Sequence, residues 1–478
     1  MSPDRLRELA LESFKELAPN GIINASSKAE VYGCLFGRDA LLTALQVLDA
    51  CQVPGYLNQS ENRWLLSIVK NTLVKLVELQ GKESNIESNE QPGKCIHEFR
   101  TEGHERLTQR PVNPEKRWEN PWYVYPDGTL RNYDSIDATP LLLITLHRYL
   151  EATHDNTFLT QALPAAEAAL NWIISYGDMD KDSLLEYEFH PQRQHGGLLV
   201  QSWADSHESL HQADGRLPKY PIKPVEVQGY AWLALKLWGD FYADRSPAFA
   251  QKLTSQAQAM KQQFNKSFIF NDPETDLYYA AQALDGDNQQ IRTITADPLI
   301  LLFASYTHPD KHVESIVEDQ YIPDLVQRAF KEDLFDPKLG IRTMSTQSRT
   351  FNPNPDSYHN GPAWMKQNWE IYSGLRQRGY SDQAKKLAQA ALKPLLHFGT
   401  PVELSNRDET GRYIRYKSNS GQEGCSIQAW TAGAVLDILG DLPTRGIGFS
   451  LRLPLFKILI PSLPSLRRVL PLPNPPTH

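Results

Sequence analysis

Two carboxylates stand out because few charged side chains surround them. Asp205 lies in the segment Gly-Gly-Leu-Leu-Val-Gln-Ser-Trp-Ala-Asp-Ser (196–206), and Glu403 lies far downstream in Thr-Pro-Val-Glu-Leu-Ser (400–405). Neither has a lysine or arginine within three residues. Hydrolysis of a glycosidic bond needs two carboxyl groups in different environments, one protonated and one ionised. Trp203 supplies an apolar surface of the kind that raises a carboxyl pKa. The pair is a candidate acid and base, although most of the 57 acidic residues are expected to be solvated surface groups.

Further polar and aromatic segments could bind sugar hydroxyls. The planar guanidinium of Arg38 offers five donors, whereas Asp39 could be only an acid in the first turn of a helix. His97, Glu98 and Arg100 crowd into one loop that could equally be a salt-bridged turn. The remaining candidates for substrate binding, each of which could also be a core or helix-capping residue, are Tyr133, Asp137, Trp203, Tyr358, His359, Trp364, Gln428 and Trp430.

One segment is similar to the start of a calcium loop. Asp178, Asp180 and Asp182 alternate along the chain and Glu186 follows them, so oxygen ligands recur at every second position. The glycine and the twelve-residue spacing of such a loop are missing, and a turn between two helices that is capped by aspartates explains the pattern equally well. We therefore expect no metal and no cofactor, and keep these aspartates as a weak calcium candidate.

Composition and charge narrow the classes of partner. The chain has 478 residues, a net charge of −8 and no basic stripe, which argues against nucleic acid. An aromatic content of 10% suits sugar binding, although a helical core also uses aromatic residues. The four cysteines are scattered and are expected to be reduced thiols. The N-terminus has no apolar signal region and no run of 18 apolar residues occurs, so no membrane span and a cytoplasmic location are expected, with the oligomeric state left open.

The dominant period of the chain is helical. Leu6, Ala10, Phe14 and Leu17 line one face of an expected first helix. Strand-like alternation is scarce, and long connections carry the unusual residues, which predicts one all-α domain with its function on loops at one rim. The proline-rich segment 444–478 is expected to be an extended tail behind a domain of residues 1–443. Further amphipathic runs lie near 39–51, 63–79, 142–150, 164–176, 225–243, 247–265, 311–331, 361–378, 382–397 and 426–439.

Read together and in order, the motifs resemble those of the amylo-α-1,6-glucosidase family, (α/α)6-toroid glycoside hydrolases related to the glucosidase part of glycogen-debranching enzymes. The resemblance covers about residues 5 to 440. The motifs are Gly-Ile-Ile-Asn-Ala-Ser (21–26), Phe-Gly-Arg-Asp (36–39), His-Glu-Phe-Arg (97–100), Tyr-Asp-Ser-Ile-Asp-Ala-Thr (133–139), Gln-Ser-Trp-Ala-Asp-Ser (201–206), Pro-Val-Glu-Val-Gln-Gly-Tyr (224–230), Gly-Ile-Arg-Thr (340–343), Ser-Tyr-His-Asn-Gly (357–361), Pro-Val-Glu-Leu (401–404) and Gln-Ala-Trp (428–430).

The resemblance implies an inverting mechanism with Asp205 as general acid and Glu403 as general base. Val402 separates proline from glutamate, a departure from the family's Pro-Glu-Leu motif that keeps Glu409 and Glu423 open as alternative bases. The resemblance also implies a toroid. Many relatives carry an N-terminal β-sandwich, but this chain starts at the expected first helix, so we expect no such domain. It adds Gln201, Glu226 and Gln228 to the expected substrate-binding residues.

Three functions stay open at this stage. The first is an exo-acting α-glucosidase of the debranching type. Partial similarity to neutral and alkaline invertases, in residues 224–228, 358–362 and 403–413, supports a β-fructofuranosidase or trehalase-like hydrolase on the same fold. A carbohydrate sensor without catalysis is the third, and the presence of both Asp205 and Glu403 speaks against it.

Overall fold

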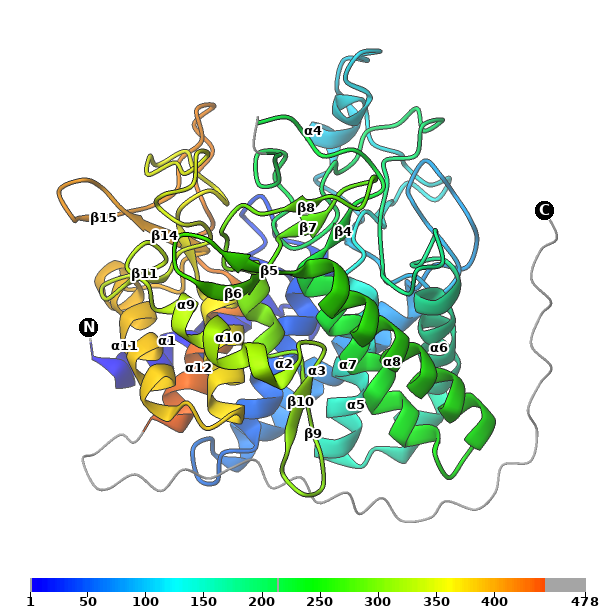
Figure 1. Cartoon of the computed structure of the whole chain (residues 1–478), viewed down its shortest axis with the longest axis horizontal. Helices are drawn as coiled ribbons and strands as arrows, with labels where there is room; N and C mark the ends of the chain where they lie inside the picture. The colour runs from blue at the N-terminus through cyan, green and yellow to red at the C-terminus, as the bar shows by residue number, and fades with distance from the viewer. Residues whose placement is uncertain (1, 213–214, 443–478) are drawn as a thin grey trace.

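The computed structural model describes residues 2–212 and 215–442, and most of their regular structure is helical (Figure 1). Periodicity predicted about a dozen helices, and twelve α-helices form in these ranges. They are α1 (Pro3–Leu17), α2 (Gly37–Cys51), α3 (Gln59–Glu78), α4 (Glu105–Thr108), α5 (Ala138–Thr153), α6 (Asn156–Ser175), α7 (Val225–Tyr242), α8 (Pro247–Phe268), α9 (Ile322–Ala329), α10 (Met365–Gln377), α11 (Ser381–Phe398) and α12 (Ala429–Asp441), with 3-10 helices η1 (Arg117–Glu119), η2 (Asp297–Leu302) and η3 (Asp319–Tyr321).

Six segments contact one another in a closed sequence. Helix α2 packs on α5, α5 on α7, α7 on η2, η2 on α10, α10 on α12, and α12 returns to α2. Each is covered by a second helix, because α3, α6, α8, α9, α11 and α1 pack against α2, α5, α7, η2, α10 and α12 in turn. Helices of the inner set are buried nearly all round, as α7 is, whereas α1 buries one stripe. The core is therefore one continuous layer between two sets of helices.

Local signals mark where several helices begin and end. Asn58 accepts from the backbone N–H groups of Ser60 and Glu61, and the Glu61 side chain accepts from the N–H of Asn58, a capping box that starts α3. Such a cap stabilises a helix by about 1 kcal/mol. Helix α11 ends at Gly399, whose φ of 74° lies in the left-handed region that glycine adopts without a steric penalty.

Short strands precede three of the inner helices. Strand β1 (Leu35–Phe36) runs into α2, β4 (Lys223–Pro224) into α7 and β13 (Ala363–Trp364) into α10. Their partners are β2 (Glu98–Arg100) and β3 (Leu130–Asn132), β7 (Ala283–Leu284) and β8 (Gln290–Ile291), and β14 (Leu404–Arg407) and β15 (Tyr413–Ile414). Figure 1 shows β4, β7, β8, β14 and long loops together on the upper side of the helices. The N-terminal ends of these inner helices thus meet the long loops at one rim.

The other strands form three two-stranded ribbons, β5 (Ile269–Asp272) with β6 (Leu277–Ala280), β9 (Ser305–Thr307) with β10 (Val313–Ser315), and β11 (Phe335–Asp336) with β12 (Gly340–Ile341). The expected helix over 311–331 is wrong in its first half, where β10 and η3 replace it. Val313 pairs there with Thr307, and the β-branched residues that follow also suit extended structure. Pro323 sits in the first turn of the shorter α9.

Two other expectations concern the C-terminus and membranes. The proposed tail, residues 444–478, lies outside the described residues. Among residues that the structure does describe, no helix is both long enough and apolar enough to cross a membrane.

Candidate active site

Arg38 joins three segments that are far apart in the sequence. It lies in the first turn of α2 and is buried. Its Nε donates to Asp137 Oδ2 at 2.6 Å, its Nη1 to Asp205 Oδ2 at 3.1 Å and its Nη2 to the carbonyl of Ser202 at 2.9 Å. Asp137 occupies the residue before α5 but makes no capping hydrogen bond, so its carboxylate serves Arg38 instead. The structure therefore brings the motifs at 36–39, 133–139 and 201–206 together.

Asp205 is the partly exposed member of this group. Its side chain is 25% exposed, whereas those of Arg38 and Asp137 are 3% and 0% exposed. Burial raises the pKa of Asp205 to about 6, and the opposing charge of Arg38 limits that rise. Arg38 binds Oδ2 of this carboxyl, and the partly exposed side chain can reach a bound molecule with its other oxygen.

Four aromatic rings pack beside Asp205. The ring of His359 stacks on Trp364 at 5.1 Å, and Trp203 stands edge-on to both at 5.3 and 5.8 Å. Tyr358 lies 4.7 Å from His359. His359 Nδ1 is 2.7 Å from the hydroxyl of Ser206, which ties these rings to the Asp205 segment. Aromatic faces of this kind suit the apolar faces of a sugar.

Glu403 lies next to the same group of aromatic rings. It directly precedes β14, whose Leu404 pairs with Trp364 of β13, so strand register places it next to the 358–364 motif. The hydroxyl of Tyr358 donates to Glu403 Oε1, and the N–H of Cys425 donates to Oε2 at 2.8 Å. Burial raises the pKa of Glu403 to about 7 against the lowering effect of these two hydrogen bonds.

Asp205 and Glu403 share one electrostatic environment. The charge of Asp205 contributes to the raised pKa of Glu403, and both carboxylates contribute to that of Asp39, which reaches about 8 mainly through burial. The other candidate bases differ, because Glu409 is exposed and the Glu423 side chain is 67% exposed beside Lys417. Of these three glutamates, Glu403 is the buried one, and the charge of Asp205 acts on it.

Two further candidates belong to the same group. Gln428 Nε2 donates to Asp39 Oδ1 at 3.0 Å, and Trp430 lies 5.8 Å from Trp364. Val402, the residue that departs from the family pattern, is buried, and its carbonyl accepts from Thr431. The extra residue is thus accommodated by packing on the start of α12, while the Glu403 carboxyl is bound by Tyr358 and Cys425.

Several predicted binding residues are bound to the protein itself. Glu98 and Arg100 form a buried ion pair beneath β1, and the His97 ring contacts Phe36 at 5.4 Å. The Tyr133 hydroxyl donates to the carbonyl of Leu79 at 2.8 Å. These four side chains support the loops around Arg38, and their contact with substrate stays a prediction.

The three residues added by the resemblance are also buried. Gln201 accepts from Asn89 at 2.8 Å, and Glu226 accepts from the N–H of Trp203 at 3.4 Å. Gln228 receives the N–H of Leu185 at 2.8 Å and donates to its carbonyl at 2.7 Å. Gln228 therefore clamps the 178–186 loop to α7, and substrate binding by these residues stays a prediction.

Sequence reasoning missed two buried groups that position Trp203. Asp297 Oδ1 accepts from Trp203 Nε1 at 2.7 Å, and the Lys366 ammonium lies 4.4 Å from the centre of the Trp203 ring. Lys366 also pairs with Glu370 at 2.8 Å, with both side chains fully buried. The available signals were an aspartate before a proline at 297–298 and a lysine two residues after Trp364.

Comparison with known proteins identifies the class. Residues 123–437 match the model of the family described as amylo-alpha-1,6-glucosidase. The ring of helices and this match define a glycoside hydrolase. The chain belongs to the amylo-alpha-1,6-glucosidase family, as the order of its motifs indicated.

Solved structures and one curated relative can also be compared with this chain. The chain resembles a GH63 mannosylglycerate hydrolase from Thermus thermophilus in complex with Tris, with a TM-score of 0.59, 15% identity, and coverage of 91% of this chain and 99% of the other. The same enzyme in complex with glucose gives a TM-score of 0.59 at 14% identity over 90% and 99% of the two chains. A mannosylglycerate hydrolase from Rubrobacter radiotolerans is 29% identical over 101 residues, 21% of this chain and 20% of that protein. These structural likenesses support the fold.

Proposed function

We propose that this protein is an inverting, exo-acting glycosidase that hydrolyses α-glucosidic bonds of glycogen or oligosaccharides. We further propose that its closed ring is an (α/α)6 toroid in which η2 takes the place of one inner helix. The observation that carries the proposal is the pair Asp205 and Glu403, which Arg38 and Tyr358 bind next to one group of packed aromatic rings. The reaction would need no cofactor, and the enzyme would act in the cytoplasm.

In this mechanism Asp205 protonates the leaving glycosidic oxygen and Glu403 takes a proton from the attacking water. Inverting enzymes hold these carboxyls ~6.5–9.5 Å apart so that water fits between base and sugar, and that spacing stays a prediction for this pair. The Tyr358 hydroxyl and the Cys425 N–H favour an ionised Glu403, as a base requires. Arg38 favours an ionised Asp205, so the productive form with a protonated Asp205 is the minor one in the free enzyme.

Substrate hydroxyls would be bound by the charged and amide groups around Arg38. Asp39 can accept two hydroxyl hydrogens, and Gln428 holds it in place. Trp203, His359 and Trp364 would contact the apolar faces of the sugar.

A second candidate substrate comes from the relatives. The Rubrobacter radiotolerans and Thermus thermophilus proteins are named as mannosylglycerate hydrolases, so a mannoside of a small acid competes with a glucan for this site. Arg38 could bind such an acid, because a guanidinium pairs with carboxylates. Sucrose would be the substrate of the invertase alternative, and trehalose that of the trehalase-like alternative.

The test is a substrate panel with the purified full-length protein. Isomaltose, panose, a branched limit dextrin, maltose, mannosylglycerate, sucrose and trehalose are each incubated, and the first product anomer is followed by proton NMR. We expect β-glucose to be released first from α-1,6-linked glucosides. Mannosylglycerate as the best substrate would move the assignment to the second candidate. Release of α-glucose would refute inversion, and saturable binding without turnover would support the sensor.

The pH profile gives a separate prediction for Tyr358→Phe. The wild type should show a bell-shaped kcat/KM with its maximum between the raised pKa values of about 6 and 7 of the two carboxyls. The hydrogen bond from Tyr358 lowers the pKa of Glu403, so its loss raises that pKa and fewer molecules carry an ionised base. Because the pKa of the base then lies further above that of the acid, the alkaline limb should move to higher pH by roughly one unit and the maximum kcat/KM should fall roughly tenfold, since a hydrogen bond to a charged group contributes about 1.5–3 kcal/mol. The acidic limb, which follows the lower pKa of Asp205, should stay in place.

Tyr416→Phe is the matched control for this prediction. Its ring lies 4.8 Å from that of Tyr358, so the change removes a hydroxyl from the same aromatic group without removing the donor to Glu403. The alkaline limb and the maximum should stay in place in this variant. An alkaline limb and a maximum that are unmoved in both variants would show that Glu403 is not the base whose ionisation limits activity.

A further inference from the structure

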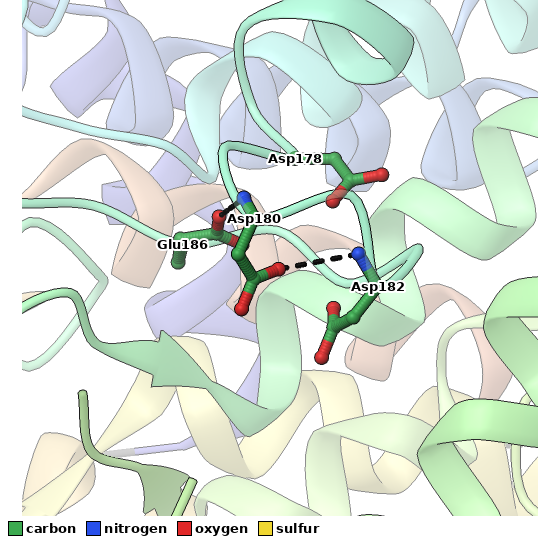
Figure 2. A group of neighbouring side chains, drawn as sticks. All are labelled: Asp178, Asp180, Asp182 and Glu186. Atoms are coloured by element: carbon green, nitrogen blue, oxygen red, sulfur yellow. Dashed lines mark hydrogen bonds between the residues drawn. The ribbon is translucent and has the colours of Figure 1, made fainter. Parts of the chain in front are cut away.

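The loop after α6 gathers four carboxylates away from the candidate active site. Asp178, Asp180, Asp182 and Glu186 each bring one carboxyl oxygen to within 4.8 Å of the others (Figure 2). Asp178 and Glu186 are buried, with 4% and 2% of their surface exposed. Four like charges this close repel one another strongly, so the group needs positive charge.

Two oxygens of the group have no hydrogen-bond partner among the residues that the structure describes. Asp178 Oδ2 accepts from the N–H of Ser183 and Glu186 Oε1 from those of Met179 and Asp180, but within the described ranges Asp178 Oδ1 and Glu186 Oε2 are buried without a hydrogen bond. A buried charged oxygen without a partner costs several kcal/mol. These free oxygens belong to the two innermost members of the cluster, which points to a cation that completes the site.

Lys223 supplies only part of the positive charge. Its ammonium lies 2.7 Å from Asp180 Oδ2 and 2.6 Å from Asp182 Oδ2. Its third hydrogen bond goes to Asn288 at 3.0 Å, and not to Asp178 or Glu186. One ammonium thus faces four carboxylates, and the two buried members are left without an ion pair of their own.

The backbone arranges the four side chains around one point. Counting Asp178 as the first position, the acids fall at positions one, three, five and nine, and Leu184 at position seven could add its carbonyl. Lys181 and Ser183 have φ values of 63° and 78°, a left-handed conformation that turns the loop tightly. The hard oxygen ligands, their number and the flexible loop all favour calcium over a transition metal.

We propose that residues 178–186 bind one calcium ion through Asp178, Asp180, Asp182 and Glu186, with the buried Lys223 as a second cation beside Asp180 and Asp182. Asp180, whose side chain is 40% exposed, offers the entry path. Gln228 of α7 holds Leu185 in the same loop, so the ion would strengthen the attachment of this loop to the inner ring ahead of the Asp205 segment. The proposal does not depend on the reaction that the enzyme catalyses.

The test is calcium binding by the full-length protein after treatment with a chelator and dialysis. Calcium chloride should raise Tm saturably, by roughly 3 °C at a hundredfold excess over Kd, because a ligand that binds only the folded state stabilises it. Terbium should bind with luminescence sensitised by neighbouring aromatic residues, and calcium should displace it. Magnesium at the same concentration should raise Tm less, since it requires a tighter octahedral geometry.

Variants locate the ion. Glu186→Gln and Asp180→Asn should each lose most of the calcium-dependent rise in Tm and weaken terbium binding at least tenfold. Asp244→Asn, the same change at an exposed acid, should keep both. Should Glu186→Gln fail to fold, the partly exposed Asp180 position decides alone. Absence of saturable binding in the wild type, or binding that survives Asp180→Asn, would overturn the site, and a larger effect of magnesium would overturn the choice of calcium.

Discussion

Replacing Asp205 with asparagine should lower kcat by ~10²–10⁴-fold on an unactivated α-glucoside and leave substrate affinity largely unchanged. Asparagine keeps the size of the side chain and can still accept from Arg38, but it cannot donate a proton to the leaving oxygen. For a nitrophenyl glucoside, whose leaving group departs without protonation, the defect should be much smaller. Steady-state kinetics on both substrates measure the difference.

A nearby acid provides the control for this experiment. Glu208 lies in the same loop as Asp205, and its side chain is 36% exposed. Asn360 binds the backbone carbonyl of Glu208, which the change to glutamine leaves in place. The kinetics of Glu208→Gln should stay close to those of the wild type. An equal loss of kcat on both substrates in Asp205→Asn would mean that Asp205 does not act as the acid.

Glu403→Gln should lower kcat by a similar ~10²–10⁴-fold, but on both kinds of substrate. Water must be activated whether or not the leaving group is good, so the nitrophenyl glucoside should not rescue this variant. Glutamine has one acceptor oxygen and one NH2 donor, so one of the two donors to Glu403, the Tyr358 hydroxyl or the Cys425 N–H, loses its acceptor. Measuring Tm beside the kinetics separates the loss of the base from a change in folding.

The exposed glutamates serve as matched controls for the base. Glu409→Gln and Glu423→Gln should keep full activity, because both side chains are solvated and far less buried than Glu403. If Glu403→Gln were fully active and one of these variants were not, the base would move to that residue.

The helices were the most predictable part of the molecule. Apolar residues at helical spacing predicted α1, α2, α8 and α11 closely, because each of these helices buries a face that repeats along the sequence. The exception over 311–331 has the same apolar content, but its first half pairs as a strand with residues 305–307. Periodicity cannot distinguish a short apolar strand from a piece of helix when the partner strand is what decides.

The sequence by itself determined the family and the set of candidate residues, because ten short motifs in a fixed order are specific even where each one alone is weak. It could not determine which of those residues meet. Arg38 reaches Asp205 and Asp137 because α2 and α5 are neighbours in the ring, and Glu403 reaches Tyr358 because β14 pairs with β13. Only the tertiary structure showed that the polar groups of Gln228, Tyr133 and the Glu98–Arg100 pair are bound to the protein itself. Only the structure showed, by contrast, that Asp205 is partly exposed. Burial and hydrogen-bond partners depend on contacts between distant segments, so local residue type leaves them undecided.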